Sequence, residues 1–357
     1  MSDKSVPIFL AFGNPLLDIS VILEPENDSL LVKHNLNPND EIEISEEKLE
    51  SMLKDLSNSS NKIHYVPGGS AQNTTRLLRW ILDVPKSTSY IGSVGRDEQG
   101  QKLEAFNSAD GVDTRYVVQE DKPTGVCLAF INGPNRSLAA HLGAAVDFKV
   151  ENFKKCQELQ VNIMKSVKII YVEGFFITNR VQVVENILQF CKTNKKLFVF
   201  NLNSEYLINS YGESMKQFAY ECDILFGNAA QYLTLAELLD MNVERTMENI
   251  ALHINEKSKT PSGNKIVIVT DGSEPVICVS GDKKLVKYDV PEISPEAVVD
   301  TTGAGDAFVA GFLAGIIKEK DLKTCLAWGC WMSRQIIQMI GCPTPKTLPK
   351  EILTVKP

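Results

Sequence analysis

The chain of 357 residues is long enough for one large α/β domain or for two average domains. Its hydrophobic fraction of 43% and charged fraction of 23% are typical of a soluble globular protein. The net charge of −8 argues against a broad nucleic-acid-binding face, so an anionic ligand would have to be held by local donors.

The eight cysteines are scattered along the chain, without a CxxC pair or metal-ligand spacing. This distribution predicts buried core thiols in a protein of a reducing compartment. The apolar run at residues 6–12 is too short for a signal sequence or a membrane span. We therefore expect a cytoplasmic protein that does not bind a membrane, and presence in the nucleus is compatible with the same features.

Apolar segments of strand length alternate with segments of helix length through most of the chain. The predicted strands lie at 8–12, 90–94, 168–172, 197–201, 224–227, 265–270 and 275–279, and the predicted helices at 45–56, 71–82, 100–108, 150–164, 181–192, 229–239, 243–257 and 322–340. Near-continuous apolar strands in a βα rhythm indicate an α/β fold, in which a mostly parallel sheet is covered by helices on both faces. Alternating segments at 40–44, 111–118 and 125–131 predict a small strand excursion. We expect one domain over residues 1–357.

The first predicted strand ends in Gly13-Asn14-Pro15-Leu16-Leu17-Asp18. In α/β sheets, ligands bind beyond the carboxyl ends of the strands, so Asn14 and Asp18 are candidate site residues. The alternative is a strand-ending Asn-Pro turn followed by a solvent-exposed aspartate.

A second strand–glycine–helix junction lies at Gly68-Gly69-Ser70-Ala71-Gln72-Asn73. Its two glycines allow the backbone to approach a ligand closely. Ser70 and Asn73 add donors and acceptors that suit sugar hydroxyls. The same residues could instead form a plain helix start with Ser70 as its N-cap.

Polar and aromatic side chains follow several later strands. Arg136 could reach a transferred phosphoryl group, or it could be a solvated turn residue. Phe175 and Phe176 could stack on a planar base, although filling of the core is the more common role of such residues. The turn residues that could hold nucleotide phosphates and a hydrated metal are Asn228, Thr270 and Gly272.

The segment Asp300–Phe308, with the sequence DTTGAGDAF, precedes a run of small and apolar residues. Gly303-Ala304-Gly305 would leave backbone N–H groups unobstructed at a helix N-terminus, which favours an anion. The segment therefore predicts a phosphate site. Asp306 would be the base that takes a proton from an attacking hydroxyl, and the alternative is a first-turn residue that interacts only with the helix dipole. Phe308 excludes a GxGxxG dinucleotide motif.

Taken together, these motifs resemble the ribokinase-like (PfkB) sugar kinases over nearly the whole chain, and among them those that phosphorylate adenosine. Residues 300–308 match the DTxGAGD signature of that family, 13–19 match GNPLLDI and 68–73 match GGSxQN. Further matches in the family's order lie at 123–125, 135–138, 174–176 and 223–228. The resemblance implies a ribokinase-like fold with a small β-strand lid, formed by segments of about 19–44 and 111–140.

The resemblance also implies a role for each candidate residue. Asp306 would be the base for the ribose 5′-hydroxyl, and the N–H groups of Gly303-Ala304-Gly305 would form an anion hole. Asp18 would accept from the 2′- and 3′-hydroxyls, and Arg136 would close over the phosphates from the lid. The residues expected at the nucleoside site are Asn14, Leu16, Asp18, Gly68, Gly69, Ser70, Asn73, Leu138, Phe175 and Thr302, and those expected on the ATP side are Asn228, Thr270, Gly272, Gly303 and Gly305.

Three positions depart from the family's pattern. The NxxE element, linked to magnesium through water, reads Asn228-Ala229-Ala230-Gln231, so an amide replaces the carboxylate. Magnesium prefers hard anionic oxygen, and Gln231 therefore predicts an altered magnesium dependence. Thr302 replaces a frequent asparagine, and Glu41 replaces an amide that often contacts the purine. These two positions bear on the choice of nucleobase.

We therefore expect an ATP- and magnesium-dependent transfer of phosphate to the 5′-hydroxyl of adenosine, which gives AMP and ADP in purine salvage. The expected partners are adenosine and ATP, without nucleic acid, and the resemblance implies a monomer because the lid caps its own site. Two alternatives remain open. One is a kinase for another nucleoside or a free sugar on the same fold, and the other is a nucleoside-binding protein that has lost the transfer.

Overall fold

The computed structural model describes residues 7–23, 29–37, 41–58, 61–132, 135–260 and 262–345. Its strands are β1 (Phe9–Phe12), β2 (Leu16–Ile22), β3 (Glu41–Glu43), β4 (Lys62–Gly68), β5 (Thr88–Gly95), β6 (Asp113–Gln119), β7 (Gly125–Asn132), β8 (Asn135–His141), β9 (Ile169–Glu173), β10 (Leu197–Asn201), β11 (Ile224–Asn228), β12 (Ile266–Asp271), β13 (Glu274–Val279) and β14 (Leu285–Tyr288). Its α-helices are α1 (Ser29–Lys33), α2 (Glu46–Ser57), α3 (Ser70–Leu82), α4 (Glu98–Ala109), α5 (Val150–Leu159), α6 (Val161–Ser166), α7 (Val181–Asn194), α8 (Glu205–Ser210), α9 (Gly212–Glu221), α10 (Ala229–Leu238), α11 (Met247–Lys257), α12 (Ala304–Ile317) and α13 (Leu322–Ile336).

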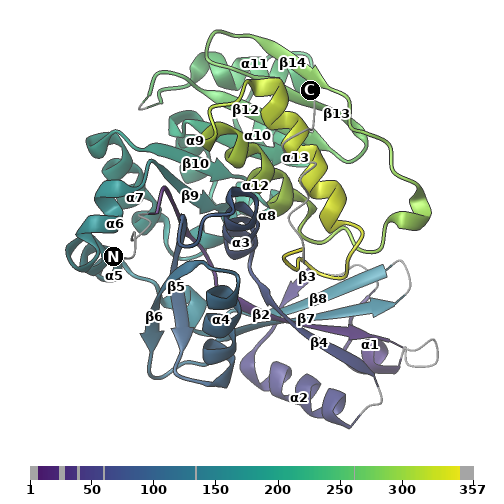
Figure 1. The fold of residues 1–357 in the computed structure, drawn as a ribbon. Helices are drawn as coiled ribbons and strands as arrows, with labels where there is room; N and C mark the ends of the chain where they lie inside the picture. Colours follow the sequence, from purple (N-terminus) through teal and green to yellow (C-terminus); the bar gives the residue numbers. More distant parts are fainter. Residues whose placement is uncertain are drawn as a thin grey trace.

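Among the described residues, the main sheet has nine strands in the order β14-β13-β12-β11-β10-β9-β1-β5-β6. In Figure 1, β13 and β14 lie at one end of this sheet and β5 and β6 at the other. Its strands run parallel from β6 to β12, and β13 and β14 pair antiparallel. The order reverses at β1, which lies between β5 and β9. Such a switch point opens a crevice at the carboxyl ends of the strands, so the residues after β1 and β9 lie where a ligand can bind.

Helices cover both faces of this sheet, as the strand pattern predicted. The side chains of β1 alternate between two hydrophobic clusters, because successive strand residues point to opposite faces. Leu10 and Phe12 pack in the cluster formed with α5, α7, α9 and α11. Phe9 and Ala11 pack in the cluster formed with α3, α12 and α13. The α/β fold class is confirmed.

A second sheet has five strands in the order β3-β8-β7-β2-β4 (Figure 1). Leu17, Ile19 and Val21 of β2 point to one face, where they form a third hydrophobic cluster with α2 and α4. Leu16 and Asp18 occupy the alternate positions of the same strand and therefore point to the other face. The sheet contains parts of both segments predicted as a lid, together with β4. In contrast, β6, which lies within residues 111–140, is the edge strand of the main sheet.

Several elements differ from the sequence prediction. The helix expected at 150–164 is two helices, because Gln160 adopts a non-helical conformation between them. The helix expected from residue 243 begins at Met247, where Thr246 is the N-cap. The sequence pattern did not predict α1, α8, α9, β2, β8 or β14. The turn residues at 209–212 hide the periodicity of α8 and α9. Pairing with β7 and β13 stabilises β8 and β14, and this pairing is a tertiary effect.

All eight cysteines are buried free thiols, as the sequence predicted. Burial raises the pKa of Cys156 to about 11 and that of Cys325 to about 12, so these thiols are protonated at neutral pH. Among the described residues, no helix is both long and apolar enough to cross a membrane.

Candidate active site

Helix α12 begins at a glycine with left-handed backbone conformation. Gly303 is the N-cap with a φ of 74°, and a Cβ there would lie 2.6 Å from the Sγ of Cys342. Both the backbone and the close contact therefore require glycine. Gly305 is exposed, with nothing within 4 Å of the position of a Cβ. The N-terminus of α12 is thus open at Gly305, whereas the N–H of Ala304 already donates to the Thr301 carbonyl at 3.2 Å.

Asp306 lies in the first turn of α12, and its carboxylate accepts hydrogen bonds from α3. Ser70 Oγ donates to Oδ1 at 2.7 Å, and Asn73 Nδ2 donates to Oδ2 at 3.1 Å. Asp306 keeps a partly exposed surface, but enough protein surrounds its carboxyl for burial to raise the pKa to about 6. The two hydrogen bonds act in the opposite direction because they favour the ionised form. The carboxylate is therefore fixed in position with a pKa suited to a general base.

The hydrogen bonds continue from Ser70 to residues that the sequence analysis did not identify. Ser70 is the first residue of α3 and Gly69 is the N-cap, so the hydroxyl does not cap the helix. Its Oγ accepts from Asn203 Nδ2 at 3.0 Å. Asn203 Oδ1 accepts from the N–H of Gly174 at 2.8 Å, and its carbonyl accepts from Gln231 Nε2 at 2.5 Å. One chain of contacts thus joins Asp306 to Gln231.

Asp18 lies against the turn that starts α3. In the pairing of β2 with β4, Leu16 is opposite Gly68 and Asp18 is opposite Val66. A Cβ on Gly68 would lie 2.0 Å from Asp18 Oδ1, so the carboxylate rests directly on the glycine. Asp18 is 9% exposed, which contradicts the solvent-exposed alternative.

Asn14 joins the ends of β1 and β9 at the switch point of the main sheet. Its Nδ2 donates to the carbonyl of Phe175 at 3.1 Å, and its Oδ1 accepts from Arg180 Nη2 at 2.7 Å. Burial lowers the pKa of Arg180 to about 10, which still leaves it charged at neutral pH. Burial raises the pKa of the neighbouring Glu173 to about 8, and the charge of Asp306 adds to this effect.

The two aromatic residues after β9 have different environments. Phe176 is fully buried, and its ring centroid lies 6.3 Å from that of Phe12 and 5.8 Å from that of Phe148. Phe175 is only half-buried, and its ring lies 6.4 Å from that of Tyr206. Phe176 therefore fills the core, whereas Phe175 keeps a surface that a ligand can contact.

The remaining candidates are Leu16, Leu138, Thr302 and Arg136, the residue predicted for the lid. Leu16 on β2 and Leu138 on β8 are half-buried strand residues of the five-stranded sheet, with β7 between the two strands. Thr302 is half-buried, and its N–H donates to Asp300 Oδ1 at 2.9 Å. Arg136 and Glu41 belong to β8 and β3, but their side chains lie outside the described part of the structure.

A cavity of about 660 Å³ lies beside the N-terminus of α12. Thr270 and Gly272 line it from β12 and the turn that follows, and Ala304 and Gly305 line it from the helix. The volume is in the usual range for a small-molecule site. The other residues that line the cavity are Ser273, Val276, Val290, Pro291, Glu292, Ile293, Thr301, Phe308, Cys330, Ser333, Arg334 and Ile337. Four residues predicted for the phosphates or the ATP side therefore share one cavity.

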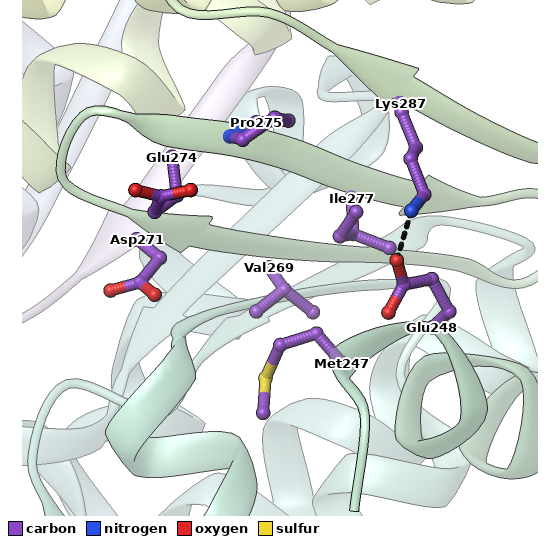
Figure 2. Close-up of a pocket in the computed structure, with 8 residues that line it drawn as sticks. All are labelled: Met247, Glu248, Val269, Asp271, Glu274, Pro275, Ile277 and Lys287. Carbon is purple, nitrogen blue, oxygen red and sulfur yellow. Dashed lines mark ion pairs between the residues drawn. The ribbon is translucent and has the colours of Figure 1, made fainter.

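A smaller cavity of about 280 Å³ lies on the opposite face of the β12–β13 hairpin (Figure 2). Val269, Asp271 and Ile277 line it, and they alternate along the strands with Thr270 and Val276 of the larger cavity. It also contains an ion pair between Glu248 and Lys287. None of the predicted site residues lines this smaller cavity.

Asn228 and Gln231 form a capping box at the start of α10. Asn228 Oδ1 accepts from the N–H of Gln231 at 2.9 Å, and Gln231 Oε1 accepts from the N–H of Asn228 at 3.0 Å. Gln231 is 7% exposed, and its Nε2 donates to Asn203. Both polar atoms of the Gln231 side chain are therefore engaged within the protein. Among the described residues, no group of three or more His, Cys, Asp or Glu could hold a metal ion.

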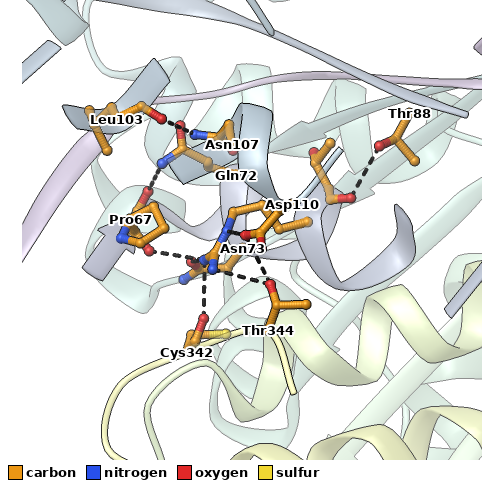
Figure 3. A network of polar contacts seen from close by, with 12 residues as sticks. Pro67, Gln72, Asn73, Thr88, Leu103, Asn107, Asp110, Cys342 and Thr344 are labelled. Carbon is orange, nitrogen blue, oxygen red and sulfur yellow. Dashed lines mark hydrogen bonds and ion pairs between the residues drawn. The ribbon is translucent and has the colours of Figure 1, made fainter. Parts of the chain in front are cut away.

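A buried arginine, Arg76, supports the Asn73 side of the site. Figure 3 labels its partners Pro67, Asn73, Asp110 and Cys342. Arg76 Nε donates to Asp110 at 2.6 Å, and its Nη1 donates to the carbonyls of Pro67 and Cys342 at 3.1 Å each. The same Nη1 lies 3.4 Å from Asn73 Oδ1, which leaves Nδ2 of that amide for Asp306. Arg76 thus fixes both the orientation of Asn73 and the chain segment behind Gly303.

Two of the residues that the sequence analysis missed differ in how they could have been found. Asn203 follows the strand predicted at 197–201, so the rule that identified Asn14 also applies to it. Arg180 carries no comparable signal, because it precedes a helix and becomes part of the site through its contacts with Phe175 and with Asn14, which is 166 residues away in the sequence.

Residues 39–349 match the pfkB family of carbohydrate kinases. The chain is 34% identical over 340 residues to adenosine kinase 2 of Arabidopsis thaliana, which covers 95% of this chain and 96% of the relative. A solved structure of Anopheles gambiae adenosine kinase in complex with P1,P4-di(adenosine-5) tetraphosphate has a TM-score of 0.84 at 33% identity, covering 95% of this chain and 99% of that one. Adenosine kinase from Schistosoma mansoni in complex with adenosine and AMP has a TM-score of 0.81 at 27% identity, covering 95% and 98%.

Proposed function

The chain belongs to the pfkB family of carbohydrate kinases, and we propose on this basis that it transfers the γ-phosphate of ATP to the 5′-hydroxyl of adenosine, giving AMP and ADP. The observation that carries the proposal is the position of Asp306. Its carboxylate is held by Ser70 and Asn73, and the next residue toward the N-terminus, Gly305, lines the cavity of about 660 Å³. A base between a nucleoside site and a nucleotide site is what the transfer requires.

On the nucleoside side, the proposal assigns the ribose hydroxyls to Asp18. A buried carboxylate that rests on a glycine can accept from two vicinal hydroxyls at once. The carbonyl of Asn14 lies against Gly69, which precedes Ser70 and Asn73 on α3. Phe175 offers a half-buried ring for the base. Leu16, Gly68, Gly69, Leu138 and Thr302 complete the proposed nucleoside site.

On the nucleotide side, the proposal assigns ATP to the larger cavity. The open first turn of α12 would stabilise charge on the γ-phosphoryl group through the N–H groups of Gly303 and Gly305. The N–H of Ala304 would divide its hydrogen bond between the phosphate and the Thr301 carbonyl. Thr270 and Gly272 would contact the nucleotide from the opposite side, and Arg136 would approach it from the five-stranded sheet. Asp306 would then take the proton from the 5′-hydroxyl as the phosphoryl group moves.

We propose that magnesium enters with ATP, where it neutralises charge on the phosphates. Asn228 is exposed and could contact the hydrated ion. Gln231 would influence the ion indirectly, because its side chain holds Asn228 in position.

A cytoplasmic location is supported by the eight free, buried thiols, since such thiols persist in a reducing compartment. A monomeric state stays a prediction.

The test measures ADP release with magnesium and ATP, with adenosine, inosine, guanosine, ribose and fructose offered in parallel. Adenosine-dependent turnover that Asp306→Asn abolishes would support both the substrate and the base. Asp240→Asn is a matched control, because Asp240 is exposed and has a φ of 45°, a conformation that asparagine also adopts. Faster turnover of another nucleoside or of a free sugar would overturn the assignment of adenosine as the substrate. Adenosine binding without turnover would favour a nucleoside-binding protein.

A further inference from the structure

Asn203 makes three contacts that connect otherwise separate parts of the site. It lies two residues beyond β10, is half-buried, and has a φ of 60°. Its amide contacts Ser70 on one side and Gly174 on the other, and its carbonyl contacts Gln231. Asparagine tolerates the left-handed conformation and offers a donor and an acceptor on one short side chain, so few residues could replace it.

The contacts determine the orientation of the Asn203 amide. The N–H of Gly174 is a donor, so the atom that faces it at 2.8 Å must be the amide oxygen. The amide nitrogen therefore faces Ser70 Oγ at 3.0 Å and donates to it. A hydroxyl has one hydrogen and two lone pairs, and the Asn203 amide donates to one of the lone pairs of Ser70. The Ser70 hydrogen is consequently directed to Asp306 Oδ1, which lies 2.7 Å away.

We propose that Asn203 is a positioning residue for the reaction, which orients Ser70 toward Asp306 and joins the base to the turn of Gln231 and Asn228. The inference rests on the proposed function, because it assigns Asp306 as the base. Asn203 donates a hydrogen bond to Ser70 and accepts one from Gln231. Gln231 in turn accepts a hydrogen bond from the N–H of Asn228. The base and the residue proposed to contact magnesium are thereby held in one geometry.

The position of the Asp306 carboxylate and its protonation both depend on this chain of hydrogen bonds. The bond from Ser70 favours the ionised form of Asp306, so a mobile Ser70 would raise the pKa of the carboxyl. The other titratable groups that interact with Asp306 are Tyr171 and Glu173 of β9 and Cys342 after α13. None of these three contacts Asn203 by a hydrogen bond among the described residues, so removing the neutral Asn203 side chain acts on Asp306 through Ser70, whereas a new charge at 203 would also act on it directly.

The test uses two variants of Asn203 in the full chain. Asn203→Gly removes the side chain and keeps the left-handed backbone, and Asn203→Asp keeps the shape and the acceptor for Gly174 but cannot donate to Ser70 when ionised. We expect both variants to lower kcat by about 10- to 100-fold with a small change in KM, because they disturb orientation and not binding. The acid limb of the kcat/KM profile should move to higher pH.

The decisive comparison is the double variant Ser70→Ala with Asn203→Gly. If Asn203 acts through Ser70, the double variant loses no more kcat than the larger of the two single losses. Ser204→Ala is the matched control, because Ser204 is the next residue and its side chain does not cap α8. The inference would be overturned if the loss of kcat in the double variant equalled the product of the two single losses. It would also be overturned by an unchanged pH profile with a lower Tm. Neither result would contradict the proposed kinase function. A parent chain without adenosine-dependent ADP release would overturn the proposed function as well.

Discussion

Asp306 is ionisable, partly exposed and enclosed by protein at the same time, and its properties follow from two opposing effects. Burial disfavours the charged carboxylate, whereas the donors Ser70 and Asn73 favour it. The result is a pKa of about 6, above the ordinary range for aspartate. Such a carboxylate is ionised at neutral pH and is a stronger base than a solvent-exposed aspartate.

Replacing Asp306 with asparagine should lower kcat by about 10²–10⁴-fold, the usual contribution of a general base. Adenosine should still bind, since Asp18 and Asn14 are unaffected. Turnover and calorimetric titration with adenosine measure the two quantities separately. A variant with retained activity would show that Asp306 is not the base.

The pH dependence of kcat/KM should report the same carboxyl group. The base must be deprotonated, so the rate should fall as the pH drops through about 6. Ser70→Ala removes a bond that favours the ionised form, so its acid limb should lie at higher pH than that of the parent protein. Identical acid limbs for the parent and Ser70→Ala would contradict this assignment, and the Ser204→Ala profile serves as the reference.

Gln231 is a departure from the family's pattern that the structure uses in a specific way. Its Nε2 donates to the Asn203 carbonyl, and a carboxylate could not replace that donor. Gln231→Glu should therefore lower the free energy of unfolding by about 1–3 kcal/mol, because the Asn203 carbonyl would face a carboxylate. We also expect the variant to require less magnesium, since an anionic oxygen binds that ion more strongly.

Thermal unfolding and a magnesium titration of turnover test these two expectations for Gln231→Glu. Gln101→Glu is the control for added charge, because Gln101 is exposed on α4. A magnesium titration that Gln231→Glu leaves unchanged would show that residue 231 does not influence the ion.

The start of α12 shows how one element can require glycine for two independent reasons. Gly303 combines a φ of 74° with a Cβ position 2.6 Å from the Sγ of Cys342. Cys342 cannot move freely, because its carbonyl is bound by the buried Arg76. A side chain at 303 would therefore displace the first turn of α12, which also carries Asp306.

Gly303→Ala should lower both Tm and kcat, whereas Gly305→Ala should affect kcat more than Tm. Gly305 has open space around it, so an added methyl group is tolerated in the folded protein but obstructs a ligand at the helix N-terminus. Unfolding curves and turnover of the two variants give the comparison. Equal losses of Tm would show that Gly305 is a structural position and not a ligand position.

At the scale of the whole molecule, the proposed site is formed by the five-stranded sheet, by helices α3 and α12 and by the β12–β13 turn. β2 and β4 of the five-stranded sheet bring Asp18 and Gly68, α3 brings Ser70 and Asn73, and α12 brings Asp306. The β12–β13 turn lines the larger cavity together with α12, on the proposed nucleotide side. The two substrates would thus be bound by different parts of the fold, which meet at one carboxylate.

Amide hydrogen exchange should show that adenosine and ATP protect different parts of the fold. Adenosine should slow exchange in β2, β4 and the start of α3, and a non-hydrolysable ATP analogue should slow it at the β12–β13 turn and in α13. Helix α5 lies in the cluster on the other face of the main sheet and is the internal reference. Protection of β8 by adenosine would support the predicted lid, and unchanged exchange in all of the five-stranded sheet would argue against it.

The sequence alone predicted the features whose physics is local. A glycine pair before a helix, a polar residue after a buried strand and small residues at a helix N-terminus are each recognisable within about ten residues. The α/β class and most elements followed from apolar periodicity for the same reason. The motif order carried the family resemblance, although it left the contacts among Asp306, Ser70 and Asn73 unspecified.

The tertiary structure decided which side chains support the proposed base. Asn203 contacts Ser70 across 133 residues of sequence, and Ser70 contacts Asp306 across 236. No local pattern encodes such pairs, because they depend on how the sheets and helices pack. Burial explains the raised pKa of Asp306, the hydrogen bonds of the Gln231 side chain and the different environments of Phe175 and Phe176. Burial exists only once the chain is folded.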